Sequence, residues 1–424
     1  MQDEIGFREI NPMADTGLTA AKQHGALLSD IAQYTTRMFE LSSPLAQGLR
    51  FVGAVAQCPQ AADIVRIASH FNLAGSGLTL EEALASCLGE CVERLSQIEH
   101  VGDIVERRSL YDADAAAVAP ALRDLMVRHL DATGVDRQSS LDWLAGRALG
   151  SGERRLIPAD WVLRRSHPGP LFDPATALST GAAAGQTFAD AALRGLLELV
   201  ERDAAAQWWI AGCRGRPFAL EELAGEAFSA RVRELRRGCR QRSTWLLDIT
   251  SELGIPVAAA VSVARDGRSF ACGIAARTAM EVAAQAAVLE LCQAELGVLL
   301  SLTRRRQCDE GRMSEEDRRT LARSMTIDAG RCELLHAIGA PLQHAVAVET
   351  DAEAGLAAIA EVFARHHLEA VLVDLTRPLF AVPVVRAIAP DLQLLPSSMQ
   401  TPRLRAALGR HGGGERWTEG IPLM

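Results

Sequence analysis

Two acidic clusters with the same internal spacing are the residues of this 424-residue chain best suited to chemistry. Carboxylates about 4 Å apart repel by about 4 kcal/mol at an effective dielectric constant of about 20, so a cluster of them needs cations or protons. Oxygen ligands favour Mg²⁺ or Ca²⁺ over zinc, and Mg²⁺ commonly binds together with substrate phosphates. The pattern Glu-x-x-Glu-Arg occurs twice, as Glu90, Glu93 and Arg94 and again as Glu198, Glu201 and Arg202.

The repeat extends beyond these residues without a gap. Glu90 and Glu198 differ by 198 − 90 = 108 positions, and the same offset relates the residues upstream. Gly77 matches Gly185, Thr79 matches Thr187, and Ala83 matches Ala191. One unit of structure is therefore expected twice.

Each copy predicts an amphipathic helix that carries the acidic residues on one face. Apolar residues recur at helical spacing after Leu80 and after Phe188, and the glutamates form a separate polar stripe. Thr79 with Glu82, and Thr187 with Asp190, have the spacing of capping boxes. A single stripe of this kind is usually a solvated helix face with an internal ion pair. Two copies can instead approach by a pseudo-twofold and bring four carboxylates together.

The chain resembles the YcaO family of ATP-dependent enzymes that activate backbone amides in peptides. The resemblance runs in order from about residue 72 to about residue 390. Besides the two acidic motifs, it includes Asp142-Trp143, Pro158-Ala159, Ser179-Thr180-Gly181, Asp248-Ile249-Thr250, Gly254-Ile255-Pro256, Glu290-Leu291-Cys292-Gln293 and Val373-Asp374-Leu375-Thr376-Arg377-Pro378, leading into Pro383-Val384-Val385-Arg386.

The resemblance implies ATP and Mg²⁺ as cofactors, held without a Walker P-loop. By this likeness the Mg²⁺ ligands are Glu90, Glu93, Glu198 and Glu201. Arg202 is the candidate catalytic residue, in contact with phosphate, and Gln186 lines the nucleotide.

Three further candidates for the nucleotide site have an equally simple structural role. Asp190 occupies the family's acidic position and can also cap its helix. Arg94 can pair with Glu90 along the helix, and Arg277 follows a predicted strand as a loop charge would. The segment Gly75-Ser76-Gly77 departs from the family's Gly-Lys-Gly, so one cation facing phosphate is absent or replaced.

The implied reaction is phosphorylation of a peptide amide oxygen by ATP, followed by attack of a nucleophile on the activated carbon. External sulfide would give a thioamide, whereas a Cys, Ser or Thr side chain of the substrate would give an azoline. Azoline-forming relatives typically end in a proline-rich tail, while residues 416–424, RWTEGIPLM, contain one proline. Thioamide formation is therefore the leading expectation. An inactive YcaO-like scaffold, or an unrelated α/β metabolic protein with a purely structural repeat, is the alternative.

The composition of the chain favours a cytoplasmic enzyme. The net charge of −9 argues against a general nucleic-acid surface, and nine cysteines without Cys-x-x-Cys favour a reducing compartment. No uninterrupted apolar run approaches the roughly 20 residues of a membrane span. The expected partners are a peptide or protein substrate and a TfuA-like or ubiquitin-activating-like leader-binding protein, with a possible homodimer.

The predicted fold is α/β or mixed α+β, a YcaO-type fold in which repeated amphipathic helices pack on β-sheets. Residues 1–65 are expected to be a helical lead-in, 66–400 the catalytic domain and 401–424 a tail. A hairpin is predicted at 255–276, a third helix at 280–296 as a partial copy of the repeat, an exposed charged helix or insertion at 303–330, and buried strands at 371–376 and 382–389.

Overall fold

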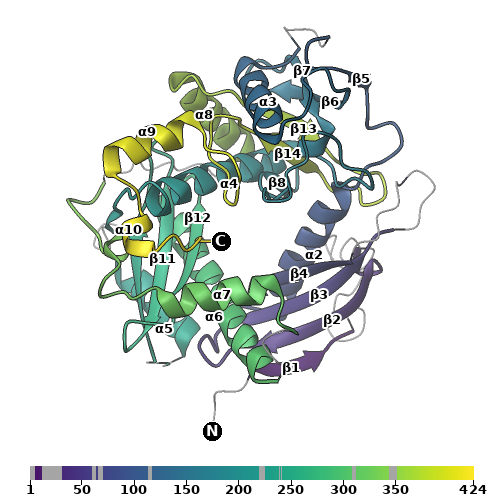
Figure 1. Cartoon of the computed structure of the whole chain (residues 1–424). Helices are drawn as coiled ribbons and strands as arrows, with labels where there is room; N and C mark the ends of the chain where they lie inside the picture. Colours follow the sequence, from purple (N-terminus) through teal and green to yellow (C-terminus); the bar gives the residue numbers. More distant parts are fainter. Residues whose placement is uncertain are drawn as a thin grey trace.

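Three antiparallel sheets, each covered by a long helix, form the framework (Figure 1). The chain is described by a computed structural model for residues 5–11, 31–59, 64, 70–112, 117–218, 225–237, 239, 241–307, 312–342 and 351–424. The mixed α and β architecture that the sequence predicts is confirmed, with helices α2, α4 and α6 packed on the sheets.

The first sheet is a meander of β1 (Gly6–Glu9), β2 (Thr35–Ser42), β3 (Arg50–Gln57) and β4 (His70–Gly77), covered by α2 (Leu80–Ser96). The prediction of a helical lead-in over residues 1–65 is wrong for β1, β2 and β3. Adjacent residues of β3, Phe51 and Val52, are buried in different hydrophobic cores, so this strand is covered on both faces. Such a strand lacks the alternation that would mark it in the sequence. Residues 12–30 lie outside the described part of the chain.

The second sheet has the order β5-β6-β13-β14-β8, with β7 paired to β6, and α4 (Phe188–Trp209) packs against β14 and β8. The predicted buried strands are confirmed as β13 (Val371–Asp374) and β14 (Val384–Ile388). The other strands of this sheet are β5 (Glu106–Arg108), β6 (Leu141–Ala148), β7 (Arg154–Pro158) and β8 (Ala182–Ala184).

The third sheet contains the predicted hairpin, formed by β11 (Val257–Ala264) and β12 (Ala271–Ala276). It continues through β10 (Arg242–Asp248) to β9 (Arg216–Pro217). The third helix, α6 (Met280–Gln307), is longer than predicted, and the charged segment that follows forms α7 (Glu315–Thr326) against it.

Helix α6 is long and apolar enough, by length and composition, to cross a membrane. It packs along β12 and β11 on one side and against α7 on another, and Glu295 is buried on it in an ion pair with Arg236. These contacts are those of a core helix.

Each sheet with its covering helix forms one unit, and the helix of each unit contacts the sheet of another, so that the three units form a closed ring. Helix α2 also contacts β8, the edge strand of the second sheet, and α4 contacts β12, the edge strand of the third. Helix α6 in turn contacts β4 at the edge of the first sheet. In Figure 1 the three helices therefore surround the middle of the molecule, where the C-terminal segment also lies.

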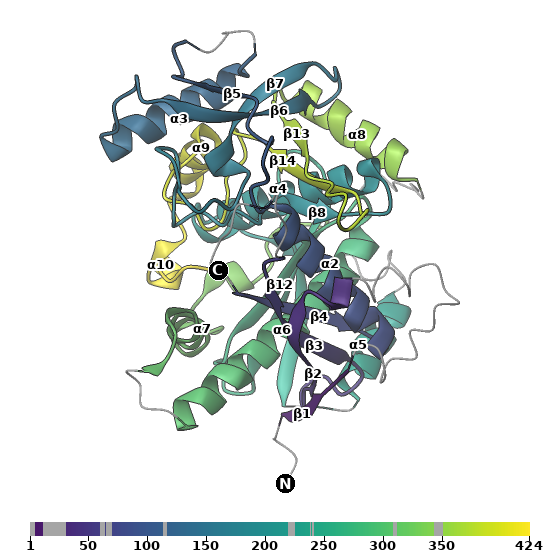
Figure 2. The ribbon, with the colours of Figure 1, turned by 90° about the vertical axis from the view of Figure 1, so that its right-hand side faces the viewer.

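Smaller elements lie around this framework; α8 packs against α4, and Figure 2 shows α3 and α8 toward the upper end of the molecule. They are α3 (Pro120–Thr133), η1 (Ala159–Trp161), α5 (Gly225–Arg236), η3 (Glu333–Leu335), α8 (Ala352–Arg365), α9 (Pro402–His411) and α10 (Glu415–Thr418). The predicted tail, 401–424, therefore contains two helices, and α9 packs against α4.

Candidate active site

The junction between strand and helix is the same in both copies of the repeat. Thr79 and Thr187 cap α2 and α4, each accepting a hydrogen bond from the amide three residues later. A Cβ at Gly77 would lie 2.7 Å from the amide nitrogen of Ala83, and one at Gly185 would lie 2.4 Å from that of Ala191. The strand can approach the helix this closely because glycine has no side chain. The 108-residue offset is thereby confirmed in three dimensions.

The first glutamate of each motif binds a backbone amide in its own unit. Glu90 accepts a hydrogen bond from the amide of Ala74 at 2.9 Å, and Glu198 accepts one from Gly181 at 2.9 Å. The second oxygen of each carboxylate faces the arginine four residues later. Arg94 Nε donates to Glu90 at 2.8 Å, and Arg202 Nη2 donates to Glu198 at 3.3 Å.

The second glutamate of each motif reaches into the next unit. Glu93 on α2 accepts a hydrogen bond from the amide of Ala184 on β8 at 2.9 Å. Glu201 on α4 accepts one from Ala276 on β12 at 3.2 Å. Glu93 is thus fixed at the boundary between the first and second units, and Glu201 at the boundary between the second and third. The charge of Glu198 on α4 acts on Glu93 on α2.

Burial, together with repulsion between the carboxylates, raises the pKa of two glutamates in this cluster. The pKa of Glu93 is raised to about 8, first by burial and then by the charges of Glu198 and Glu90. The pKa of Glu201 is also raised to about 8, by burial and by the charges of Glu290 and Glu198. Without a cation these groups hold protons near neutral pH, which is the property expected of empty cation ligands.

Arg202 lies between the carboxylates with part of its bonding capacity unused. Its guanidinium is 3.8 Å from Glu201 and donates to Glu198. Within the described chain, its buried Nε has no hydrogen-bond partner. The Sδ of Met424 contacts Nη1. A buried donor without a partner is costly, so a phosphate oxygen fits here.

The third helix contributes residues that the sequence analysis did not include in the site. Glu290 and Gln293 line a cavity of ≈ 770 Å³ together with Arg202, Arg319 of α7 and Met424. Glu290 lies 290 − 198 = 92 residues after Glu198, in the partial third copy of the repeat. That position was the available signal, but Gln293 replaces the second glutamate and interrupts the motif.

The ordered motifs and the repeated unit can now be compared with known families. The family model described as "YcaO cyclodehydratase, ATP- and Mg²⁺-binding" matches residues 74–393. The chain belongs to the YcaO family. The match lies inside the predicted catalytic domain, 66–400, and ATP and Mg²⁺ are the cofactors of this family's domain.

Solved YcaO-type structures share the fold at low sequence identity. A structure described as "Heterocyclase in complex with substrate and Cofactor" superposes with a TM-score of 0.71 at 21% identity, covering 89% of this chain and 54% of that one. The heterocyclase TruD gives 0.62 at 22% identity, over 82% and 50%. YcaO from Methanopyrus kandleri, bound with AMPPCP and Mg²⁺, gives 0.58 at 24% identity, over 88% and 89%.

A curated relative matches part of the chain in sequence. An uncharacterized protein of Methanothermobacter thermautotrophicus is 26% identical over 230 residues, which cover 52% of this chain and 56% of that protein. The chain thus spans about half the length of the two heterocyclases, and the matched segment covers about half of this relative.

The residues of the YcaO site fit Mg²⁺ and a triphosphate. The side chains of the described residues place no three acidic, His or Cys groups around one point. A cation here would therefore take one or two carboxylates and fill its other positions with phosphate oxygens and water, as Mg²⁺ commonly does. The raised pKa values of Glu93 and Glu201 and the unpaired Nε of Arg202 match such a ligand.

The remaining predicted site residues lie around this cluster. The predicted capping box is half formed at α4, because Thr187 accepts from the amide of Asp190 while the Asp190 carboxylate accepts from the amide of Gln186, at 3.0 Å, instead of that of Thr187. Asp190 also pairs with Arg194 at 2.8 Å, and its nucleotide contact stays a prediction. The side chain of Gln186 is exposed at the start of α4. Arg277 donates to the carbonyl of Ala276, and its charge acts on Glu201.

Two arginines beside the cluster, half-buried Arg164 and buried Arg386, were not among the predicted site residues, although Arg386 ends the Pro383-Val384-Val385-Arg386 segment of the resemblance. Arg164 lies near Glu90 and Arg94, and burial lowers its pKa to about 10. Arg386 of β14 lies near Glu198, and burial likewise lowers its pKa to about 10. A single arginine has no repeated spacing in the sequence from which its place beside the acidic cluster could be predicted.

Proposed function

We propose that this YcaO protein uses ATP and Mg²⁺ to activate a backbone amide of a peptide or protein, leading to a thioamide. The observation that carries the proposal is that the second glutamate of each Glu-x-x-Glu-Arg motif is hydrogen-bonded to the sheet of the next unit. Glu93 bonds to β8 and Glu201 to β12, and Arg202 lies between the carboxylates. This arrangement suits binding of phosphates through cations and a guanidinium.

ATP supplies the phosphoryl group that makes the amide oxygen a leaving group, and Mg²⁺ neutralises the phosphate charge. The residues of the chain position these groups. Glu90, Glu93, Glu198 and Glu201 would hold the cations, and Arg202 would offer its free Nε to a phosphate oxygen. Their hydrogen bonds to strand amides fix the carboxylates in place before the ligand arrives, so little reorganisation is needed at the moment of reaction.

The product assignment rests on the segment that enters the cavity. Leu423 and Met424 line the cavity with Arg202, and the carbonyl of Ile421 accepts a hydrogen bond from Trp209 Nε1 at 2.7 Å. This segment carries a single proline, Pro422. On this composition of the segment 421–424 we propose the thioamide branch, with azoline formation on Cys, Ser or Thr as the second candidate.

We also propose a separate partner protein and a cytoplasmic location. The partner would be a TfuA-like protein or a ubiquitin-activating-like leader-binding protein. A chain of the E. coli microcin synthetase McbBCD complex shares this fold at 15% identity and a TM-score of 0.59. As a second arrangement we propose a homodimer of this chain.

The test is mass spectrometry of candidate peptides after incubation with the protein, Mg²⁺-ATP, a sulfide source and each partner protein. Exchange of oxygen for sulfur at a backbone amide is the expected result. Loss of water at a Cys, Ser or Thr would instead establish the azoline branch. Failure to bind Mg²⁺-ATP at all would overturn both and favour an inactive scaffold.

A further inference from the structure

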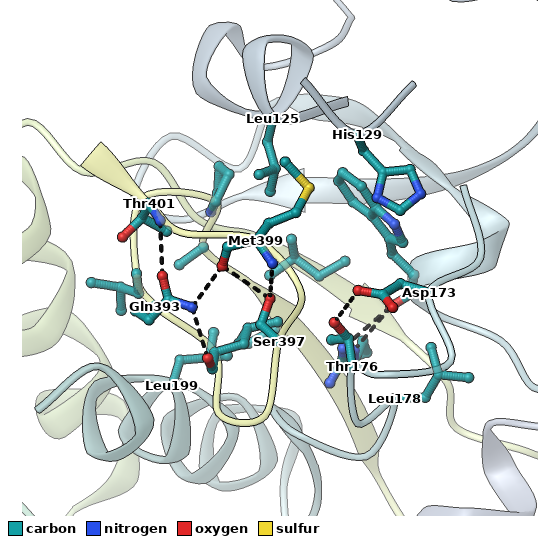
Figure 3. A pocket seen from close by; sticks show the side chains of 18 of the residues that line it. Leu125, His129, Asp173, Thr176, Leu178, Leu199, Gln393, Ser397, Met399 and Thr401 are labelled. Carbon is teal, nitrogen blue, oxygen red and sulfur yellow. Dashed lines mark hydrogen bonds between the residues drawn. The ribbon is translucent and has the colours of Figure 1, made fainter. Parts of the chain in front are cut away.

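A second cavity lies behind β14, on residues that the proposed reaction does not use. It measures ≈ 80 Å³ and is walled by α3, η1, the segment 173–178 and the loop 389–401 (Figure 3). Its lining is mostly apolar, with Leu125, Leu178, Leu394 and Met399 among the side chains. None of the four motif glutamates belongs to it.

Two buried polar side chains in the wall have unused hydrogen-bonding atoms. Arg386 and His129 are each 3% exposed. Among the described residues, Nη1 of Arg386 and Nε2 of His129 have no hydrogen-bond partner. Arg386 uses its Nε and Nη2 on the carbonyl of Trp161, at 3.3 and 3.2 Å. A buried guanidinium with a free donor is destabilising unless an acceptor, preferably an anion, meets it.

The acidic side chains of the wall are already engaged. Asp160 pairs with Arg165 at 2.9 Å and accepts the amides of Gly169 and Leu171. Asp173 accepts hydrogen bonds from the Thr176 hydroxyl, the Ser398 hydroxyl and the amide of Ala175. Glu198 attracts Arg386 from the neighbouring site, but burial outweighs this attraction and lowers the arginine's pKa to about 10. Of the charged side chains that line the cavity, Arg386 is therefore the one with a buried atom that has no hydrogen-bond partner among the described residues.

We propose that this cavity binds a short aliphatic carboxylate, with its oxygens on Arg386 and His129 and its carbon chain among the leucines and Met399. A cluster of waters is a poorer match, because each water needs two to four polar partners and the wall offers few free ones. At about 10–15 Å³ for each water position, ≈ 80 Å³ corresponds to about five to eight waters, so the cavity has room for a short aliphatic acid in their place. The proposal is independent of the peptide chemistry at the carboxylate cluster.

The experiment is a calorimetric titration of the full chain with sodium isovalerate, sodium butyrate and the neutral amide of isovalerate. Isovalerate and butyrate are expected to bind, and the amide at least roughly tenfold more weakly because it brings no charge to Arg386. Absence of binding by either acid to the wild-type protein would overturn the proposal. Equal affinity for the acid and the amide would overturn the role of the charge.

Two variants locate the site. Ala389→Leu places a larger side chain in the cavity, and Arg386→Met removes the hydrogen-bond donor. Each variant is expected to weaken the binding of isovalerate at least roughly tenfold. The matched controls are Ala406→Leu and Arg405→Met on the exposed face of α9. If Arg386→Met fails to fold, Ala389→Leu decides alone. Unchanged isovalerate affinity in folded Ala389→Leu would show that the acid binds elsewhere.

Discussion

The carboxylate of Glu93 and the amide of Ala184 are joined by a 2.9 Å hydrogen bond that crosses from the first helix to the second sheet. Glu201 and Ala276 repeat this relationship between the second helix and the third sheet. The same residues that would hold cations therefore also connect the units of the fold. Any change at these glutamates affects both ligand binding and the boundary between units, and the predictions below separate the two effects.

Glu201→Gln is expected to abolish ATP turnover while leaving the fold intact. The amide keeps the side-chain volume and can still accept the hydrogen bond of Ala276, but it removes one charge from the cation site. The melting temperature of the ligand-free protein is expected to rise near pH 7, because glutamine removes the cost of keeping Glu201 protonated in the folded chain, where its pKa is about 8. Phosphate release with peptide and partner present, together with calorimetric melting, measures both effects. Wild-type turnover would refute the metal assignment; Glu81→Gln, on the exposed side of α2, is the matched control.

The stability of the ligand-free protein is expected to fall as the pH rises from about 4.5 to about 8. Glu93 and Glu201 have pKa values near 8 in the folded chain, against 4.5 for an ordinary glutamate. At low pH both states are protonated. Between pH 4.5 and about 8 the unfolded chain ionises while the folded chain retains its protons, so unfolding becomes progressively more favourable. Chemical denaturation across this range checks the slope, which should be smaller in Glu93→Gln.

Mg²⁺-ATP should release protons when it binds near pH 7, because cation ligands must be deprotonated. Calorimetric titrations in buffers of different ionisation enthalpy measure the number of protons released. Binding without proton release would contradict a role for Glu93 and Glu201 as ligands. The Glu93→Gln variant should release fewer protons than the wild-type protein.

Much of the site could be read from the sequence because it resides in a repeat, whereas the rest depends on contacts between distant segments. The offset of 108 residues matched Glu198 to Glu90 in the repeat, and the capping threonines predicted where α2 and α4 begin. Strand β3 could not be recognised, since both of its faces are buried. Arg386 lies beside the acidic cluster because β14 pairs with β8, and no local sequence pattern predicts that pairing.

Cys87→Ala and Cys91→Ala are each expected to cost on the order of 1 kcal/mol of stability without loss of product formation. Both thiols are fully buried in the first hydrophobic core, and burial raises the pKa of Cys91 to about 12. Such thiols are poor nucleophiles, because the thiolate is the reactive form. Product formation is measured by mass spectrometry of the modified peptide. Its loss in a folded double variant would revive a sulfur-carrying role for these residues.

Leu423→Ala is expected to lower both the stability and the rate of ATP turnover. Leu423 is 5% exposed in the second hydrophobic core, and truncating a buried leucine costs about 2–5 kcal/mol. It also anchors the segment that brings Met424 against Arg202, so turnover should fall even at temperatures where the variant is folded. The matched control is Leu379→Ala, since Leu379 is 42% exposed and its truncation removes little buried surface. Circular dichroism establishes the folded fraction and phosphate release gives the rate. A folded Leu423→Ala variant with the wild-type rate would show that the segment 421–424 fills the cavity without contributing to the reaction.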